Sequence, residues 1–184
     1  MDRVTAGPAP SAEEFFDPAL IAESAKKSGL LWVVADGEER SRPLWHAWHD
    51  DAVVVVGDGA EQPLHGLADG RSAVVTVRSK DKGGRLVRWP ARVVELAPGS
   101  EAWLAATEEL KVKRLNAPDT DTITDRWARE CRVLRLEPAG PTTQHPGAMP
   151  DTSGAAQPAP SPAITRRPIP AGLPRLLFRR RRRG

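Results

Sequence analysis

The sequence predicts a mainly β domain of the α+β class, a six-stranded antiparallel barrel with flanking helices. Short apolar or alternating runs, separated by turn signals, recur over residues 30–57 and 71–97. Residues 85–97 form a run long enough to bend around two sides of a barrel. Trp89-Pro90 lies at its middle, where proline removes a hydrogen-bond donor and favours a bulge or an edge. These features favour closure of the sheet.

The first predicted element is a helix. Asp17 is a good N-cap and Pro18 suits the first helical position, while Gly29 is a typical stop. Residues 30–35 follow as a short apolar run of the kind found in buried strands, closed by a turn.

Two hairpins make up the centre of the predicted barrel. Residues 42–49 read as one strand, and residues 52–57 read as its antiparallel partner. Residues 62–69 read as one or two helical turns. A second hairpin then occupies residues 71–97.

The last two predicted elements are a helix and a strand. Pro98-Gly99-Ser100 breaks the chain and caps a helix over residues 101–115, whose apolar side chains lie roughly on one face. Residues 131–138 alternate as a final strand. Together these elements define a predicted domain over residues 12–138.

Both ends of the chain are predicted to be disordered, over residues 1–11 and 139–184. The C-terminal segment holds nine of the 18 prolines, with eight arginines and one aspartate. It therefore carries a charge of +7, which leaves −4 on the preceding residues and argues against nucleic-acid binding by the domain itself. The run Arg179–Arg183 would bind nucleic acid or an acidic membrane surface weakly, or serve only as a solubilising tail.

Several classes of protein are disfavoured by the residues present. No apolar run approaches the ~20 residues that span a bilayer, and the N-terminus lacks a secretory signal pattern. The single cysteine, Cys131, fits a cytoplasmic protein. His46 and His49 fall on opposite faces of a strand, so no metal site is expected. By the same alternation, one of Trp45 and Trp48 should point into the barrel and the other toward a cleft.

The order of elements, more than any one motif, resembles a known family. The segments that carry it are Arg42-Pro43-Leu44-Trp45, residues 50–57, the predicted short helix ending LADG before RSAVVTV, and Trp89-Pro90-Ala91-Arg92-Val93-Val94. Over residues 17–137 the chain resembles the FMN-binding split β-barrel of the pyridoxamine 5′-phosphate oxidase-like superfamily, which includes flavin- and F420-dependent reductases. The resemblance implies a homodimer that binds FMN, or alternatively F420, and acts as an oxidoreductase on a small organic substrate.

The resemblance also implies a set of cofactor-binding residues, although it identifies no catalytic acid or base. The residues expected along the flavin ring are Arg42, Leu44, Trp45 and His46; those expected toward the ribityl chain and phosphate are Val56, Gly57 and Gln62, with Lys80 or Arg85 as phosphate support.

The loop that holds the phosphate in this family departs from the pattern here. Residues 57–63 contain Asp58 and Glu61 and no basic residue, although a phosphate needs cationic or N–H donors. Backbone amides of Gly57 and Gly59, the start of a helix at Gln62, or cations of the neighbouring hairpin would have to compensate. The alternative is a split-barrel dimer without cofactor or redox activity, which serves as a binding or scaffold protein.

Overall fold

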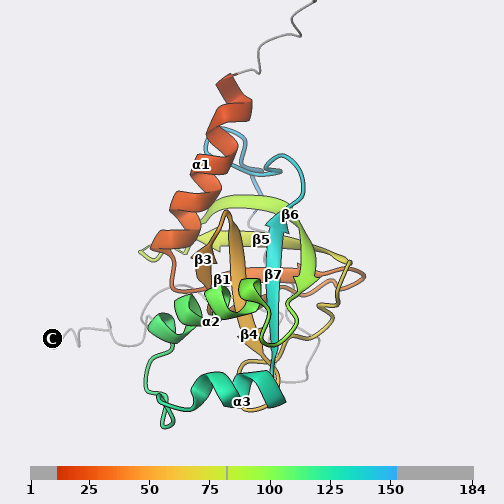
Figure 1. Ribbon diagram of the computed structural model, residues 1–184. Helices are drawn as coiled ribbons and strands as arrows, with labels where there is room; N and C mark the ends of the chain where they lie inside the picture. Colours follow the sequence, from red (N-terminus) through yellow and green to blue (C-terminus); the bar gives the residue numbers. More distant parts are fainter. Residues whose placement is uncertain (1–11, 82, 153–184) are drawn as a thin grey trace, which may run out of the picture. The chain divides into compact units, whose positions relative to one another are not determined.

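The computed structural model describes residues 12–81 and 83–152 of the chain, and the predictions for residues 1–11 and most of the basic tail lie outside them. Its centre is a curled antiparallel sheet (Figure 1). The strands are β1 (Leu31–Ala35), β2 (Arg42–Leu44), β3 (Ala47–His49), β4 (Ala52–Gly57), β5 (Ser72–Arg78), β6 (Arg85–Glu95) and β7 (Arg132–Pro138). The sheet confirms the predicted mainly β fold class.

The strand order is β2-β1-β5-β6-β7-β4-β3, so β2 and β3 form the two edges of the sheet. These edge strands are consecutive in the chain and are joined only by Trp45 and His46. The prediction of a single strand over residues 42–49 is therefore wrong, and the structure has seven strands where six were expected. At the break, the Gln62 side chain takes the place of a strand partner by bonding to both the backbone N–H and the carbonyl of Trp45.

Three helices accompany the sheet: α1 (Ala12–Lys27), α2 (Glu101–Lys113) and α3 (Ile123–Glu130). The predicted start of α1 at Asp17 and Pro18 is wrong, because the helix begins at Ala12 and contains Pro18. The predicted helix at Glu101 is confirmed, and the Ser100 hydroxyl caps it by accepting a bond from the Trp103 N–H. Sequence periodicity missed α3, which has only eight residues.

Residues 62–69 do not form the predicted helical turns. They follow β4 as a series of tight turns, with Gly66 and Gly70 in the left-handed region at φ of 71° and 73°. Leu64 and Leu67 are buried in the core and hold this segment against the sheet. The segment is thus held by burial of the two leucines, without helical hydrogen bonding.

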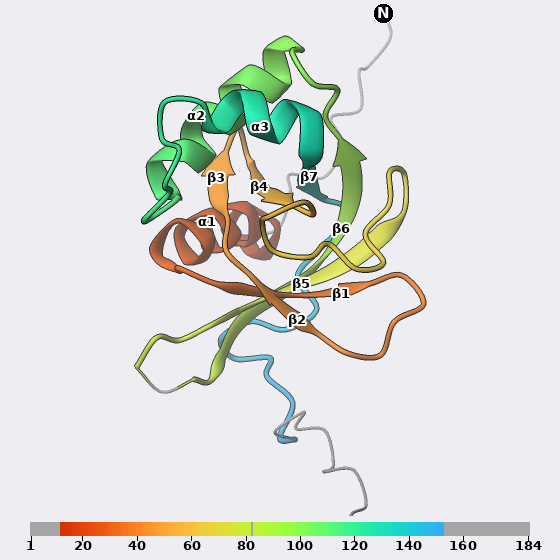
Figure 2. The same ribbon diagram turned by 90° about the horizontal axis from the view of Figure 1, so that it is seen from below.

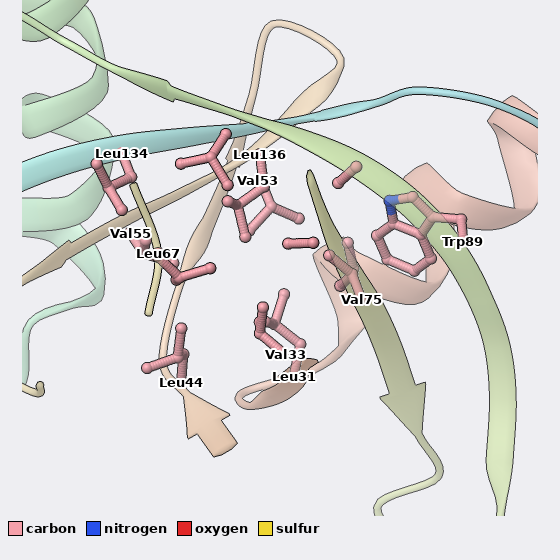
Figure 3. Close-up of a cluster of buried hydrophobic side chains, with 14 of the residues drawn as sticks. Leu31, Val33, Leu44, Val53, Val55, Leu67, Val75, Trp89, Leu134 and Leu136 are labelled. Atoms are coloured by element: carbon pink, nitrogen blue, oxygen red, sulfur yellow. The ribbon is translucent and has the colours of Figure 1, made fainter. Parts of the chain in front are cut away.

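Two hydrophobic clusters form the core, one on each side of β4. Val53 and Val55 point into the barrel interior, where α1, the strands β1, β2, β5, β6 and β7, and the segment after β4 contribute the other side chains (Figure 3). Val54 and Val56 point the other way and pack beneath α2 and α3. Every residue of β4 is buried as a result, which accounts for its uninterrupted valine run.

The strand β6 lies near the middle of the sheet and pairs with β5 over its residues 85–92. Its C-terminal half pairs with β7, and beyond Pro138 the chain stays bonded to its N-terminal half. The Ala139 N–H donates to Pro90 at 2.9 Å, and Arg88 and Gln144 form a bridge. The first residues of the predicted tail thus remain attached to the domain.

Figure 2 shows β3 beside the α2–α3 pair, with α1 on its other side. Contacts join β3 to both α1 and α2, which brings the C-terminal regions of these two helices to the β2–β3 break. Among the helices that the structure describes, none combines the length and apolar character needed to cross a membrane.

Candidate functional site

An open groove of about 450 Å³ lies where α1, α2 and the β2–β3 break meet. We call it the basic groove; it is lined by Lys26, Lys27, Ser28, Gly29, Trp45, His46, Lys80, Val112, Lys113, Arg114 and Leu115. Five of these residues are lysine or arginine, and none of them is acidic. Its volume lies within the range of small-molecule sites, about 300–1,000 Å³. The groove is therefore large enough for a nucleotide-sized anion.

The positive charge of the groove comes mainly from two helix ends. Lys26 and Lys27 lie in the last turn of α1, and Lys113 lies in the last turn of α2. Cations are favoured there by the negative end of the helix dipole. Lys27 pairs with Glu23 at 2.9 Å, whereas Lys26, Lys80 and Lys113 form no salt bridge with any residue that the structure describes. The convergence of the helix ends thus leaves cations without local carboxylate partners.

His46 forms part of the groove wall and is only 4% exposed. Burial lowers the pKa of its imidazole to about 4, although a bond to the Ala25 carbonyl opposes the shift, and Lys113 lowers the pKa further. The Nε2 atom lies 3.0 Å from that carbonyl oxygen, so Nε2 carries the proton of the neutral ring. Nδ1 is then an acceptor, and it is buried without a partner among the described residues.

The two tryptophans near the break pack in different directions. Trp48 packs against the barrel interior, whereas Trp45 packs against the cluster under α2 and lines the basic groove. The Gln62 amide holds Trp45 at both its N–H and carbonyl, each at 2.8 Å. Trp45 is therefore a half-buried residue at the edge of the groove whose backbone is held in place.

The acidic loop after β4 has its charges neutralised within the protein. The Glu61 side chain is 1% exposed and accepts bonds from Arg114 at 2.9 Å, Arg126 at 3.0 Å and the Trp127 indole N–H at 3.0 Å. Asp58 accepts a bond from the Leu64 N–H at 3.1 Å. The expectation that this loop would repel a phosphate is not supported, because its buried carboxylate already has two arginine partners.

The two glycines of this loop serve packing. A Cβ atom on Gly57 would lie 2.2 Å from the Gln62 carbonyl oxygen and 2.5 Å from Leu64. A Cβ atom on Gly59 would lie 2.7 Å from the Glu130 carbonyl oxygen, and Gly59 also has a φ of 55°. Protein atoms therefore occupy the space that a side chain at either position would need.

The structure brings together three of the nine residues that the sequence indicated for a cofactor. Trp45, His46 and Lys80 line the basic groove. Arg42 and Leu44 instead line a separate hollow of only about 10 Å³.

The other four indicated residues do not line the groove either. Val56 is buried in the core, Gly57 is enclosed, and Arg85 lies at the start of β6. The Gln62 amide is bonded to the backbone of Trp45 and to the Val56 carbonyl. These positions stay predictions for a cofactor that approaches from elsewhere.

Four groove cations were not among the residues indicated by the sequence: Lys26, Lys27, Lys113 and Arg114. The available signal was the basic last turn of each predicted helix, but that feature has a local explanation in the helix dipole. The described residues contain no group of three or more His, Cys, Asp or Glu side chains placed to hold a metal ion.

Neither a protein-family model nor a curated protein matches the chain. Solved structures do match. A conserved hypothetical protein from Mycobacterium tuberculosis aligns with a TM-score of 0.50 and 12% identity, over 76% of this chain and 87% of that one. The heme storage protein HutZ from Vibrio cholerae aligns with a TM-score of 0.49 and 14% identity, over 66% and 89% of the respective chains.

A third match is the FAD and heme binding protein from Mycobacterium smegmatis, with a TM-score of 0.45 and 16% identity over 92% of this chain and 95% of that one. At these identities the matches bear on the fold alone. The protein is a curled, antiparallel split barrel with flanking helices. This fold agrees with the split β-barrel that was expected from the sequence.

Proposed function

We propose that this chain binds a flavin-type nucleotide, FMN or F420, in the basic groove and acts as an oxidoreductase on a small organic substrate. The observation that carries the proposal is the set of five cations around a groove without acidic lining residues. A phosphate carries between one and two negative charges and requires cationic or N–H donors. The groove supplies those donors, whereas the loop after β4 does not.

The donor set of the groove fits the parts of such a nucleotide. Lys26, Lys80 and Lys113 have no salt-bridge partner among the described residues and would hold the phosphate. The half-buried Trp45 ring provides an apolar wall of the kind on which planar rings pack. Nδ1 of His46 would accept a hydrogen bond from a ligand N–H or O–H group that reaches it.

When bound, the flavin would supply the hydride acceptor or donor, and the protein would supply binding and orientation. Lysines at the ends of α1 and α2 would bind the phosphate of the nucleotide. Trp45, whose backbone is bonded to Gln62, would limit movement of the flavin ring. His46 is neutral near pH 7, so it would contribute a hydrogen bond without adding charge. The proposal includes a homodimer, in which the second copy covers the open side of the groove.

The test is titration calorimetry of the full chain with FMN, F420 and riboflavin, which lacks the phosphate. The double variant Lys26→Ala/Lys113→Ala is expected to weaken FMN binding by about tenfold or more, because two charge-assisted contacts are lost. Riboflavin binding should change much less. Lys111→Ala is the matched control, since Lys111 lies in the same last turn of α2 but does not line the groove.

Two results would contradict the proposal. The first is the absence of heat with any flavin-type nucleotide while the protein remains folded, which would favour the binding or scaffold alternative. The second is an equal loss of FMN affinity in the Lys111→Ala control and in the groove double variant. That result would show that FMN affinity depends on the overall positive charge of the protein and not on the groove. A ligand-dependent rise in melting temperature provides an independent check.

A further inference from the structure

Arg114 differs from the other cations of the basic groove because it is held at both ends. Its backbone N–H closes α2 by donating to the carbonyl of Leu110 at 2.9 Å. Its Nε donates to Oε2 of Glu61 at 2.9 Å, and its Nη1 donates to the Leu115 carbonyl at 2.7 Å. Among the described residues, the groove lysines have no comparable buried partner.

Glu61 is itself held firmly. Its Oε1 atom accepts bonds from Nη2 of Arg126 and from the indole N–H of Trp127, both at 3.0 Å. Asp119 binds the same Arg126 from the other side at 2.6 Å. We call Glu61, Arg114, Asp119, Arg126 and Trp127 the ion cluster. Since the carboxylate is 1% exposed and bonded through both oxygens, it is a rigid support for the guanidinium of Arg114.

Part of the Arg114 guanidinium remains available. Nε uses its single hydrogen on Glu61, and Nη1 uses one of its two on Leu115. The remaining hydrogen of Nη1 and both hydrogens of Nη2 have no acceptor among the described residues. A planar guanidinium with a fixed orientation offers its free donors as a fork that matches phosphate oxygens. Arg114 has this arrangement at the wall of the groove.

We infer that Glu61 is a positioning residue for the anion site of the basic groove: it fixes the Arg114 guanidinium, whose remaining donors then bind the phosphate of the ligand. The inference rests on the proposed function. It gives the acidic loop after β4 a role in phosphate binding that is indirect, since Glu61 acts through Arg114 and touches no ligand. A fixed donor loses less conformational entropy on binding than a free side chain does, which favours affinity.

Charge alone predicts the opposite result. Glu61 is a negative group bonded to the wall of an anion site, so its neutralisation would raise the local positive potential and strengthen phosphate binding if charge were its main effect. If its main effect is to position Arg114, neutralisation weakens binding. The sign of the change in phosphate affinity therefore distinguishes an electrostatic effect of Glu61 from its effect on the position of Arg114.

The experiment compares Glu61→Gln with the wild-type chain, using FMN, F420 and riboflavin as probes in titration calorimetry. Glu61→Gln is expected to weaken binding of the phosphate-bearing probe by about tenfold, and riboflavin binding by much less. In an Arg114→Gln background the same change should cause no further loss. Asp119→Asn is the matched control, because it removes a carboxylate from Arg126 while leaving the Glu61–Arg114 bond in place.

Arg114→Lys provides a second test that leaves the buried carboxylate untouched. Lysine keeps the charge but lacks the fork, so the loss of FMN affinity should match that of Arg114→Gln. Wild-type affinity in Arg114→Lys would overturn the inference, and so would unchanged or tighter FMN binding in Glu61→Gln. A loss in Asp119→Asn equal to that in Glu61→Gln would also overturn it, since general loosening of the ion cluster would then explain both.

A readout without flavin separates this inference from the proposed function. In a ¹H–¹⁵N spectrum, the Nε–H signal of Arg114 should be sharp and shifted in the wild type and in Asp119→Asn, and should move to the free-arginine position in Glu61→Gln. Added inorganic pyrophosphate should shift it further only where Glu61 is present. If flavins fail to bind but pyrophosphate gives this pattern, the proposed function fails and the positioning role stands; an Arg114 signal indifferent to Glu61→Gln overturns the inference.

Discussion

The ion cluster and the basic groove lie on either side of Arg114 at the end of α2, and they treat charge in opposite ways. In the ion cluster each arginine meets a carboxylate, and Glu61 is bonded through both oxygens. In the groove, Lys26, Lys80 and Lys113 have no salt-bridge partner among the described residues. Both regions contain basic side chains, but only the ion cluster pairs them with buried carboxylates.

The difference is explained by access to water. A buried charge without a partner is costly, so the buried Glu61 must be paired within the fold. Lysines at an open groove keep their hydration, and the protein tolerates them without carboxylates. Charge compensation within the fold therefore distinguishes a cluster that holds the structure together from a group of cations able to bind an external anion.

The largest expected effect comes from removing the carboxylate of the ion cluster. Glu61→Ala leaves Arg114 and Arg126 without their shared buried partner, and should lower the free energy of unfolding by about 3–5 kcal/mol. Urea unfolding monitored by tryptophan fluorescence measures the change. A loss below about 1 kcal/mol is what exposed ion pairs give, and it would show that the buried Glu61 contributes no more to stability than a surface charge does.

The next largest effect concerns His46, which is neutral near pH 7 and forms part of the groove wall. His46 has a pKa of about 4 in the folded protein and about 6.5 in the unfolded chain, so as pH falls between these values the unfolded state takes up the proton first. The contribution of His46 to stability is complete above about pH 6.5 and is lost as pH falls toward 4. The loss is up to about 3 kcal/mol, since each pKa unit corresponds to about 1.4 kcal/mol.

The measurement for His46 is the difference in unfolding free energy between the wild type and His46→Asn at several pH values. Carboxylates titrate in both proteins and cancel in the difference. The advantage of the wild type should shrink from about pH 7 to about pH 4.5. A constant difference would mean that His46 is not buried in its neutral form, and the groove wall would then differ from the structure described.

The smallest expected effect on stability is at the groove lysines. Lys26→Ala/Lys113→Ala should change the free energy of unfolding by no more than about 0.5 kcal/mol, because these cations form no salt bridge within the part of the chain that the structure describes. Chemical denaturation at low and high salt measures it. A loss of several kcal/mol would make the groove another structural cluster, and the contrast with Glu61 would disappear.

The valine run of β4 and the alternation of β7 were readable in the sequence because burial imposes a residue pattern on each strand. The break at Trp45 and His46 was not readable. At the break, Trp45 bonds to the side-chain amide of Gln62, which lies 17 residues away in the chain in a segment that looks like an ordinary loop. Local pattern thus located the strands but not the point at which the chain passes from one sheet edge to the other.

The candidate site shows the same division. Trp45, His46 and Lys80 were indicated by resemblance, whereas Lys26 and Lys113 became candidates only when α1 and α2 were seen to end at the same place. The dipole of its own helix explains each of these lysines. Neither segment of the sequence therefore indicates that the two helix ends lie close together.

The amino-acid sequence by itself determined the mainly β class, most of the strands and the presence of an acidic loop, because these depend on periodicity and on residue type. Tertiary structure alone decided where the loop's charge resides: Glu61 faces inward to Arg114 and Arg126, which follow it by 53 and 65 positions in the chain. Ion pairs form over a few ångströms in space, whatever the separation of the two residues in the sequence. Only the folded chain therefore shows that the Glu61 carboxylate is paired within the protein and does not face a ligand.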